Sequence, residues 1–156
     1  MVVSFGALIA VVGSAVNAIQ EIHNITRGMY TAGIRPEGGF NALADAAIAA
    51  GISMRGMADI ITKFGGVAVT LGTRRMMTLQ SQFARLTGRG AEFIMNQEEA
   101  QQALLDSMEM LRISNQLSTM TDAQILNSSR RMIANFNEMA LATVRIEMNC
   151  VDQLSH

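Results

Sequence analysis

The first twenty residues of this 156-residue chain, Met1 to Gln20, carry no charged side chain, whereas roughly the last sixty carry Arg and Glu at helical spacing. A helix of ~20 uncharged, mainly apolar residues is long enough to cross a bilayer, because each residue adds ~1.5 Å along the axis. This contrast predicts a chain built for two environments. Either the segment meets lipid, or packing against other helices hides it.

The composition leaves few charges to coat an independent globule, since charged residues are 16% of the chain and apolar residues 49%. The chain also has 13 Met but an aromatic share of only 4%. Methionine fills irregular cores and adaptable interfaces alike, so a Met-rich helical core and Met-rich contacts between subunits both stay open. We expect neighbouring polypeptides, including copies of this chain, to cover much of the surface.

The charge balance argues against nucleic acid as a specific partner, because a net charge of -1 gives no basic footprint. Cys150 is the only cysteine and cannot form an internal disulfide, which fits synthesis in a reducing compartment. No Lys or Arg precedes the apolar start, so a secretory signal peptide fits poorly. Synthesis in a reducing cytoplasm is the expectation.

Residues that could carry catalysis are scarce. The two histidines, His23 and His156, lie near opposite ends of the chain. No His or Cys pair has the spacing of a metal site, and the glycine pairs do not follow a predicted strand as a phosphate-binding loop would. The sequence therefore predicts no enzyme, no cofactor, no metal and no small-molecule substrate.

Glycines and the single proline divide the chain into four predicted regions of an all-α fold. Residues 1–32 form an apolar, membrane-like helix, and residues 33–39 are a Gly/Pro linker. Residues 40–95 are short amphipathic helices with glycine breaks, and residues 96–156 are a helical hairpin with a heptad-like last helix. The expected molecule is elongated and assembled in several copies.

Local signals place several helix ends. Gly51 should stop one helix, and Ser53 should cap the next. Asn96 should begin a helix that runs to about Leu117, and a capping box at residues 121–124 should begin the last one. The apolar run 67–71 could be a strand by composition, but it has no candidate partner strand, so we expect a helical turn or an extended linker.

Two patterns suggest where helices contact one another. Three small residues at four-residue spacing in the N-terminal helix would allow close approach of another helix. In the last helix, apolar residues repeat every seven residues, and the companion seam of Ser129, Phe136, Thr143 and Cys150 is only partly apolar, which predicts modest association. The candidate contact residues are Ala10, Ser14, Ala18, Ile125, Met132, Phe136, Met139 and Ile146.

The order of these pieces carries a family likeness. After the apolar start and the linker come Ala50-Gly51-Ile52-Ser53 and Leu71-Gly72, and within the hairpin come Glu98-Glu99-Ala100, Leu104-Leu105-Asp106, Thr121-Asp122-Ala123-Gln124-Ile125 and Asn135-Phe136 through Ala142-Thr143. In this order the chain resembles the tail tape measure proteins of contractile-tailed bacteriophages. The likeness is closest over residues 29–86 and 96–143.

The resemblance implies a helical virion protein in the tail lumen, around which the tail tube assembles to a set length. It also implies exit ahead of the genome, with apolar segments helping passage through the host envelope. The implied partners are tail tube proteins, the baseplate hub, copies of itself and the host membrane. The chain departs from the family in having Val144 where a glycine is expected and in being short, as a fragment or a short version would be.

Two other readings stay open on the residues alone. A small helical membrane protein, pore-forming or lysis-related, would use Met1 to Gln20 as a permanent span. An all-helical soluble adaptor would bury that segment in its own bundle and would be a stable monomer without detergent.

Overall fold

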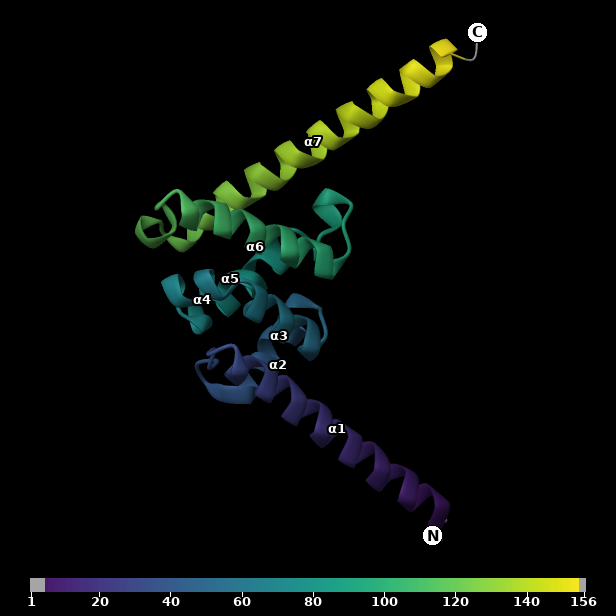
Figure 1. Ribbon diagram of the computed structural model, residues 1–156, viewed down its shortest axis with the longest axis vertical. Helices are drawn as coiled ribbons and strands as arrows, with labels where there is room; N and C mark the ends of the chain where they lie inside the picture. The colour runs from purple at the N-terminus through teal and green to yellow at the C-terminus, as the bar shows by residue number, and fades with distance from the viewer. Residues whose placement is uncertain (1–4, 155–156) are drawn as a thin grey trace. The chain divides into compact units, whose positions relative to one another are not determined.

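The computed structural model describes the backbone of residues 5–154 and the side chains of residues 17–154. Throughout this described part the regular structure is helical, with seven α-helices, two short 3-10 helices and no strand (Figure 1), which confirms the predicted all-α class. In chain order the elements are α1 Phe5–Thr31, α2 Gly39–Ala50, α3 Met54–Lys63, α4 Gly65–Leu71, α5 Thr73–Leu86, η1 Ala91–Phe93, α6 Gln97–Ile113, η2 Leu117–Thr119 and α7 Asp122–Leu154. The chain divides into two compact units, residues 1–35 and 36–156.

The first unit contains α1 and its C-terminal turn. The turn closes where the Gly33 amide donates to the Tyr30 carbonyl oxygen at 3.0 Å and the Ile34 amide donates to the Met29 carbonyl oxygen at 2.9 Å. Gly33 has φ +78°, the left-handed conformation that commonly ends a helix. Among the described residues, no helix is both long enough and apolar enough to span a membrane. The side chains of residues 1–16, most of the charge-free segment, lie outside the described part.

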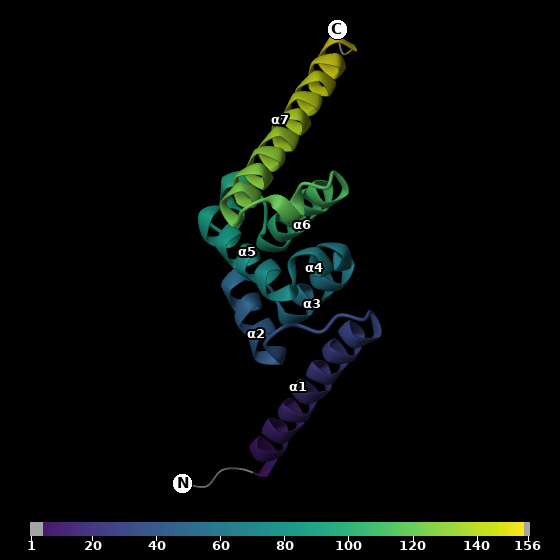
Figure 2. The same cartoon turned by 90° about the vertical axis from the view of Figure 1, so that its left-hand side faces the viewer.

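The second unit is a helical bundle in which α2 packs on α3 and α5, while α6 packs on α4, α5 and α7 (Figure 2). Its core combines aliphatic, aromatic and methionine side chains. Phe83 stacks on Phe93 with ring centroids 6.2 Å apart and an interplanar angle of 14°. The largest fully buried side chains of this unit are Phe83, Leu43, Met57, Ile61, Met76, Leu79, Leu104, Leu105, Met108, Leu117 and Ile125.

Methionine occurs both in the core and on the surface of the second unit. Met57, Met76 and Met108 are fully buried, so a Met-rich core exists. Met139 and Met148 are exposed on α7, where 65% and 63% of their surface is accessible. The flexible thioether therefore fills the centre of the bundle and also lines part of its exterior.

The predicted helix ends at Gly51, Ser53, Asn96 and Thr121 are confirmed. Gly51 ends α2 with φ +74°, and the Ser53 hydroxyl oxygen accepts from the Gly56 amide at 2.9 Å. The Asn96 side chain accepts from the Glu99 amide at 2.8 Å while the Glu99 carboxylate accepts from the Asn96 amide at 3.1 Å, a complete capping box. The reciprocal pair between Thr121 and Gln124 forms a second one.

The end of α6 differs from the prediction. The helix stops at Ile113 instead of continuing to about Leu117. Asn115 adopts φ +59°, a conformation that Asn tolerates better than most residues, and the Gln116 amide donates back to the Leu111 carbonyl oxygen at 2.9 Å. Leu117 then begins η2 and is fully buried. The chain turns early because that turn places Leu117 in the core.

The other ambiguous segment is helical. Residues 67–71 belong to α4, with Val67 and Ala68 buried and Val69 85% exposed. Gly66 lies next to the Arg112 side chain, since an added Cβ would come within 2.8 Å of Arg112 Nε. Gly66 therefore lets α4 approach α6 closely. The segment 67–71 is helical, so the expected helical turn is confirmed and the extended linker is not.

We predict that Gly90→Ala lowers the free energy of unfolding by about 2 kcal/mol or more. Gly90 has φ +93°, and a Cβ there would lie 2.8 Å from the Met95 carbonyl oxygen and 2.9 Å from Ala100 Cβ. Gly28→Ala is the control, because Gly28 is helical with no neighbouring atom within 4 Å of an added Cβ. Urea denaturation should show loss for Gly90→Ala only. Equal midpoints for the two variants would contradict the packing described.

A second prediction concerns Glu109, whose pKa lies below its usual value because Arg112 hydrogen-bonds to the carboxylate. Arg112 Nε donates to Glu109 Oε2 at 2.8 Å, and a second bond joins Nη2 to Oε1. A lowered folded-state pKa stabilises the fold above the usual pKa of about 4.5, and this contribution is lost as pH falls through the lowered value.

We therefore expect Glu109→Gln to cost ~0.5 kcal/mol at pH 7, after allowing for solvent screening of this half-exposed pair, and to reduce the loss of stability below pH ~4.5. Denaturation at a series of pH values measures both effects. Glu138→Gln, at an exposed position of α7, is the control. If both variants followed the wild-type pH curve, the Glu109–Arg112 pair would not contribute.

Candidate functional site

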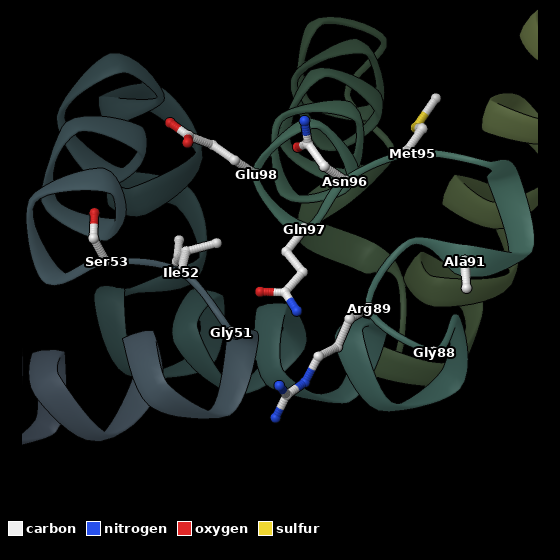
Figure 3. Close-up of a pocket in the computed structure, with 10 residues that line it drawn as sticks. All are labelled: Gly51, Ile52, Ser53, Gly88, Arg89, Ala91, Met95, Asn96, Gln97 and Glu98. Carbon is white, nitrogen blue, oxygen red and sulfur yellow. The ribbon is translucent and has the colours of Figure 1, made fainter.

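A hollow in the second unit lies where the α2–α3 turn faces the segment between α5 and α6 (Figure 3). Its volume is about 660 Å³, and it is open to solvent. Three stretches of chain line it, which are Gly51, Ile52 and Ser53, then Gly88, Arg89 and Ala91, and finally Met95, Asn96, Gln97 and Glu98. All three stretches are helix ends or turns.

The segment between α5 and α6, residues 87–96, has an unusual backbone. Three successive residues, Gly88, Arg89 and Gly90, have positive φ angles of 58°, 57° and 93°. The turn is held because the Arg89 amide donates to the Ala84 carbonyl oxygen at 2.7 Å and the Gly90 amide donates to the buried Thr87 hydroxyl oxygen at 3.3 Å. These bonds hold the backbone of residues 88–90 in this conformation beside the hollow. The turn is one of the glycine breaks predicted for residues 40–95.

Gln97 lies at the centre of the hollow. In Figure 3 its side chain extends between Gly51 and Arg89. A Cβ on Gly51 would come within 2.6 Å of Gln97 Oε1 and 3.1 Å of Arg89 Cδ. Glycine at position 51 thus serves two purposes, since it ends α2 in the left-handed conformation and leaves space for the Gln97 amide.

The chemistry available in the hollow is hydrogen bonding. Its charged side chains are Arg89 and Glu98, and the Ser53 hydroxyl and Asn96 amide oxygens already accept bonds that cap α3 and α6. None of the ten lining residues is a His, Cys or Lys. In the part of the chain that the structure describes, no group of three or more His, Cys, Asp or Glu residues could hold a metal ion. Arg89 and Gln97 supply side-chain N–H donors to the hollow.

A second feature of the 87–96 segment is Ile94, which has φ +55° and is 94% exposed. A β-branched residue in the left-handed region is a genuine outlier, and such strain is found where the backbone serves a function. Asn137 Nδ2 donates to the Phe93 carbonyl oxygen at 3.1 Å, and Arg130 pairs with Glu92 at 2.7 Å. Both contacts place the strained residue beside α7.

Beyond these contacts α7 continues without cover from the bundle. Ile133 is the last buried residue of α7, and every residue from Glu138 to Leu154 is exposed. We call residues 134–154 the α7 extension. Its large exposed apolar side chains are Phe136, Met139, Leu141, Val144, Ile146, Met148, Val151 and Leu154.

The candidate contact residues of the sequence fall into different surroundings. Ile125 is buried in the bundle and Met132 is half-buried, whereas Phe136, Met139 and Ile146 are exposed on the α7 extension. In the N-terminal stripe Ala18 is exposed, while the side chains of Ala10 and Ser14 lie outside the described part. The sequence reasoning missed Ile94, Val144 and Val151. A helical period of 3.6 residues, continued from the buried face of α7, would have found the two valines.

We predict that Ile94→Asn raises the free energy of unfolding by ~1 kcal/mol, because Asn adopts the left-handed conformation more readily and the replaced side chain is almost fully exposed. Ile48→Asn is the control, since Ile48 is 73% exposed within α2 and has no positive φ. Thermal unfolding should show a higher midpoint for Ile94→Asn and a slightly lower one for Ile48→Asn. A lower midpoint for Ile94→Asn would mean that Ile94 stabilises the folded chain.

Comparison with protein-family models, with curated proteins and with solved structures finds no match for this chain. The arguments on function therefore come from the residues, the helix ends and the exposed surfaces described above.

Proposed function

We propose that this chain is a structural virion protein of the tail lumen of a contractile-tailed phage, acting as a tape measure. In this role the tail tube assembles around it to a set length, and it leaves ahead of the genome to help passage through the host envelope. Tail tube proteins, the baseplate hub and copies of itself are its partners, and the host envelope is met on ejection. The role requires neither a cofactor nor a catalytic site.

The observation that carries the proposal is the α7 extension. Seventeen successive exposed residues, 138–154, continue a helix whose apolar side chains find no cover in the described chain. An isolated helix of this length is marginal in water and is stabilised by neighbours on its apolar face. A protein enclosed by other subunits meets this requirement, and the near-neutral net charge of -1 suits it better than binding to DNA.

Two further features support the proposal. The order of helix ends and breaks that resembles tape measure proteins includes Gly51, Ser53, the Asn96 capping box and the Thr121 capping box, all of which occur as helix ends. The charge-free segment from Met1 to Gln20 provides an apolar part for the step at the host envelope. The same segment favours the alternative function, a small helical membrane protein that forms pores or assists lysis.

Fractionation of infected cells separates these functions. We expect the epitope-tagged chain to co-sediment with assembled tails and to resist extraction by mild detergent, because tube subunits surround it. Recovery in the membrane fraction, released by detergent in the absence of tails, would favour the membrane protein. A soluble monodisperse monomer would contradict both and leave the adaptor.

Tail length gives the sharper measurement. Duplication of α7 adds 33 helical residues, so tails should lengthen by up to ~50 Å at ~1.5 Å per residue. Electron microscopy of several hundred tails measures the mean length. Asn149→Ala, an exposed change that keeps the helix length, is the control and should give tails of normal length. Unchanged tails after duplication would exclude a measuring role.

A further inference from the structure

The buried face of α7 continues into the α7 extension. Ile125, Ser129 and Ile133 are buried against the bundle. At ~100° per residue, steps of three and four carry this same face onward along the extension. The residues reached in this way are Phe136, Ala140, Val144, Glu147, Val151 and Leu154.

Further apolar residues widen the face on both sides. Met139, Ile146 and Cys150 flank one edge, and Leu141 and Met148 flank the other. Three charged residues, Glu138, Arg145 and Asp152, recur every seventh position on the opposite side of the helix. The extension is therefore amphipathic, with an apolar face that starts beside the strained Ile94 and ends at Leu154.

We propose that this face is an interaction surface for a second copy of the chain, with the two α7 extensions packed antiparallel. The inference goes beyond the tape measure role, because it concerns the isolated chain and needs no tail. It names the residues that meet and the direction in which they run.

The area favours a second copy as the occupant. The eight large apolar side chains of the extension are 51–87% exposed. With about 60–120 Å² buried per fully covered side chain, one extension offers roughly 500 Å² and two offer about 1,000 Å². That total meets the lower limit of ~1,000 Å² for a specific protein interface, and a copy of the same helix supplies a partner face of matching length.

The charges argue against an anionic membrane as the occupant. Helices that lie on such membranes carry Lys and Arg on their polar face. The polar face of the extension has one basic residue, Arg145, between two acidic residues, Glu138 and Asp152. This polar face would therefore not attract acidic lipid headgroups.

The position of Glu147 favours the antiparallel direction. Glu147 is the one charged residue in the middle of the apolar face. In a parallel pair, the two Glu147 carboxylates would lie at the same height on facing surfaces and repel each other. In an antiparallel pair centred on residue 145, Glu147 lies at the height of Thr143 of the other copy, so the two carboxylates are offset by four residues, or ~6 Å, along the axis and repel each other less.

The same register brings apolar residues together along the whole face. It aligns Phe136 with Leu154 of the other copy and Val144 with Ile146. It also aligns Ala140 with Cys150. Leu154 of each copy then reaches the root of the other extension, where the exposed Ile94 lies next to the Phe93 that Asn137 contacts.

Sedimentation equilibrium of the full chain under reducing conditions tests the surface. We expect a dimer at tens of micromolar for the wild type and a dissociation constant at least ~30-fold higher for Val144→Glu, because the new carboxylate replaces an apolar contact and lies next to Glu147 of the other copy, which repels it. Asn149→Glu is the matched control, because it adds the same charge on the opposite side of the same helix and should leave the dimer intact. Both positions are exposed, so circular dichroism should show unchanged folding.

Disulfide formation tests the direction. Ala140→Cys should cross-link rapidly to Cys150 of the other copy under mild oxidation, whereas wild-type chains with Cys150 alone should cross-link slowly. Ten residues separate positions 140 and 150, or ~15 Å along one helix, so an internal disulfide cannot form. Ala142→Cys, on the polar side, is the control and should behave like the wild type.

Four results would overturn the proposal. These are a wild-type monomer at tens of micromolar, equal dissociation constants for Val144→Glu and Asn149→Glu, and wild-type cross-linking through Cys150 as fast as that of Ala140→Cys. The fourth is a monomer that binds neutral phosphatidylcholine vesicles in a manner lost in Val144→Glu, which would assign the face to lipid. None of these results bears on whether the chain co-sediments with tails, so the two proposals fail separately.

Discussion

The mismatch in length between α6 and α7 governs the second unit. α7 has 33 residues and α6 has 17, so only the first part of α7 can be covered by its neighbour. Within the covered part, Ile125 and Ile133 complete a core that also contains Leu104 and Met108. Beyond it the same apolar face continues with nothing from the described bundle against it. Because apolar surface in water is costly, covering this face would be favourable.

The segment from residue 87 to residue 96 connects the two surfaces that could serve function. Its backbone turns three times through the left-handed region at Gly88, Arg89 and Gly90, which closes one wall of the hollow that contains Gln97. It then presents Ile94 to solvent and holds α7 through Glu92 and the Phe93 carbonyl oxygen. The hollow has both polar and apolar lining and carries the N–H donors of Arg89 and Gln97, whereas the exposed surface of the α7 extension is largely apolar.

Local signals in the sequence predicted helix ends well, because a cap depends on a few adjacent residues. The Asn96–Glu99 and Thr121–Gln124 pairs form the expected reciprocal bonds, and Gly51 ends α2 as expected. The end of α6 was predicted near Leu117, beyond its actual end at Ile113, because the burial of Leu117 depends on the rest of the core and not on the adjacent residues. Among the candidate site features, the hollow could not be predicted because residues 51–53 are distant in the sequence from residues 88–98, and only the fold brings them together.

The sequence by itself determined that the described chain is helical, where several helices begin or end, and that the last helix has an apolar face, because each of these follows from interactions within a few residues. Only the tertiary structure decided which part of that face is core and which is surface. Ile125 and Phe136 belong to the same predicted heptad pattern, yet Ile125 is fully buried and Phe136 is 56% exposed. The difference arises because α6 packs against only the first part of α7. How far a neighbouring helix extends cannot be predicted from the local sequence of the helix that it covers.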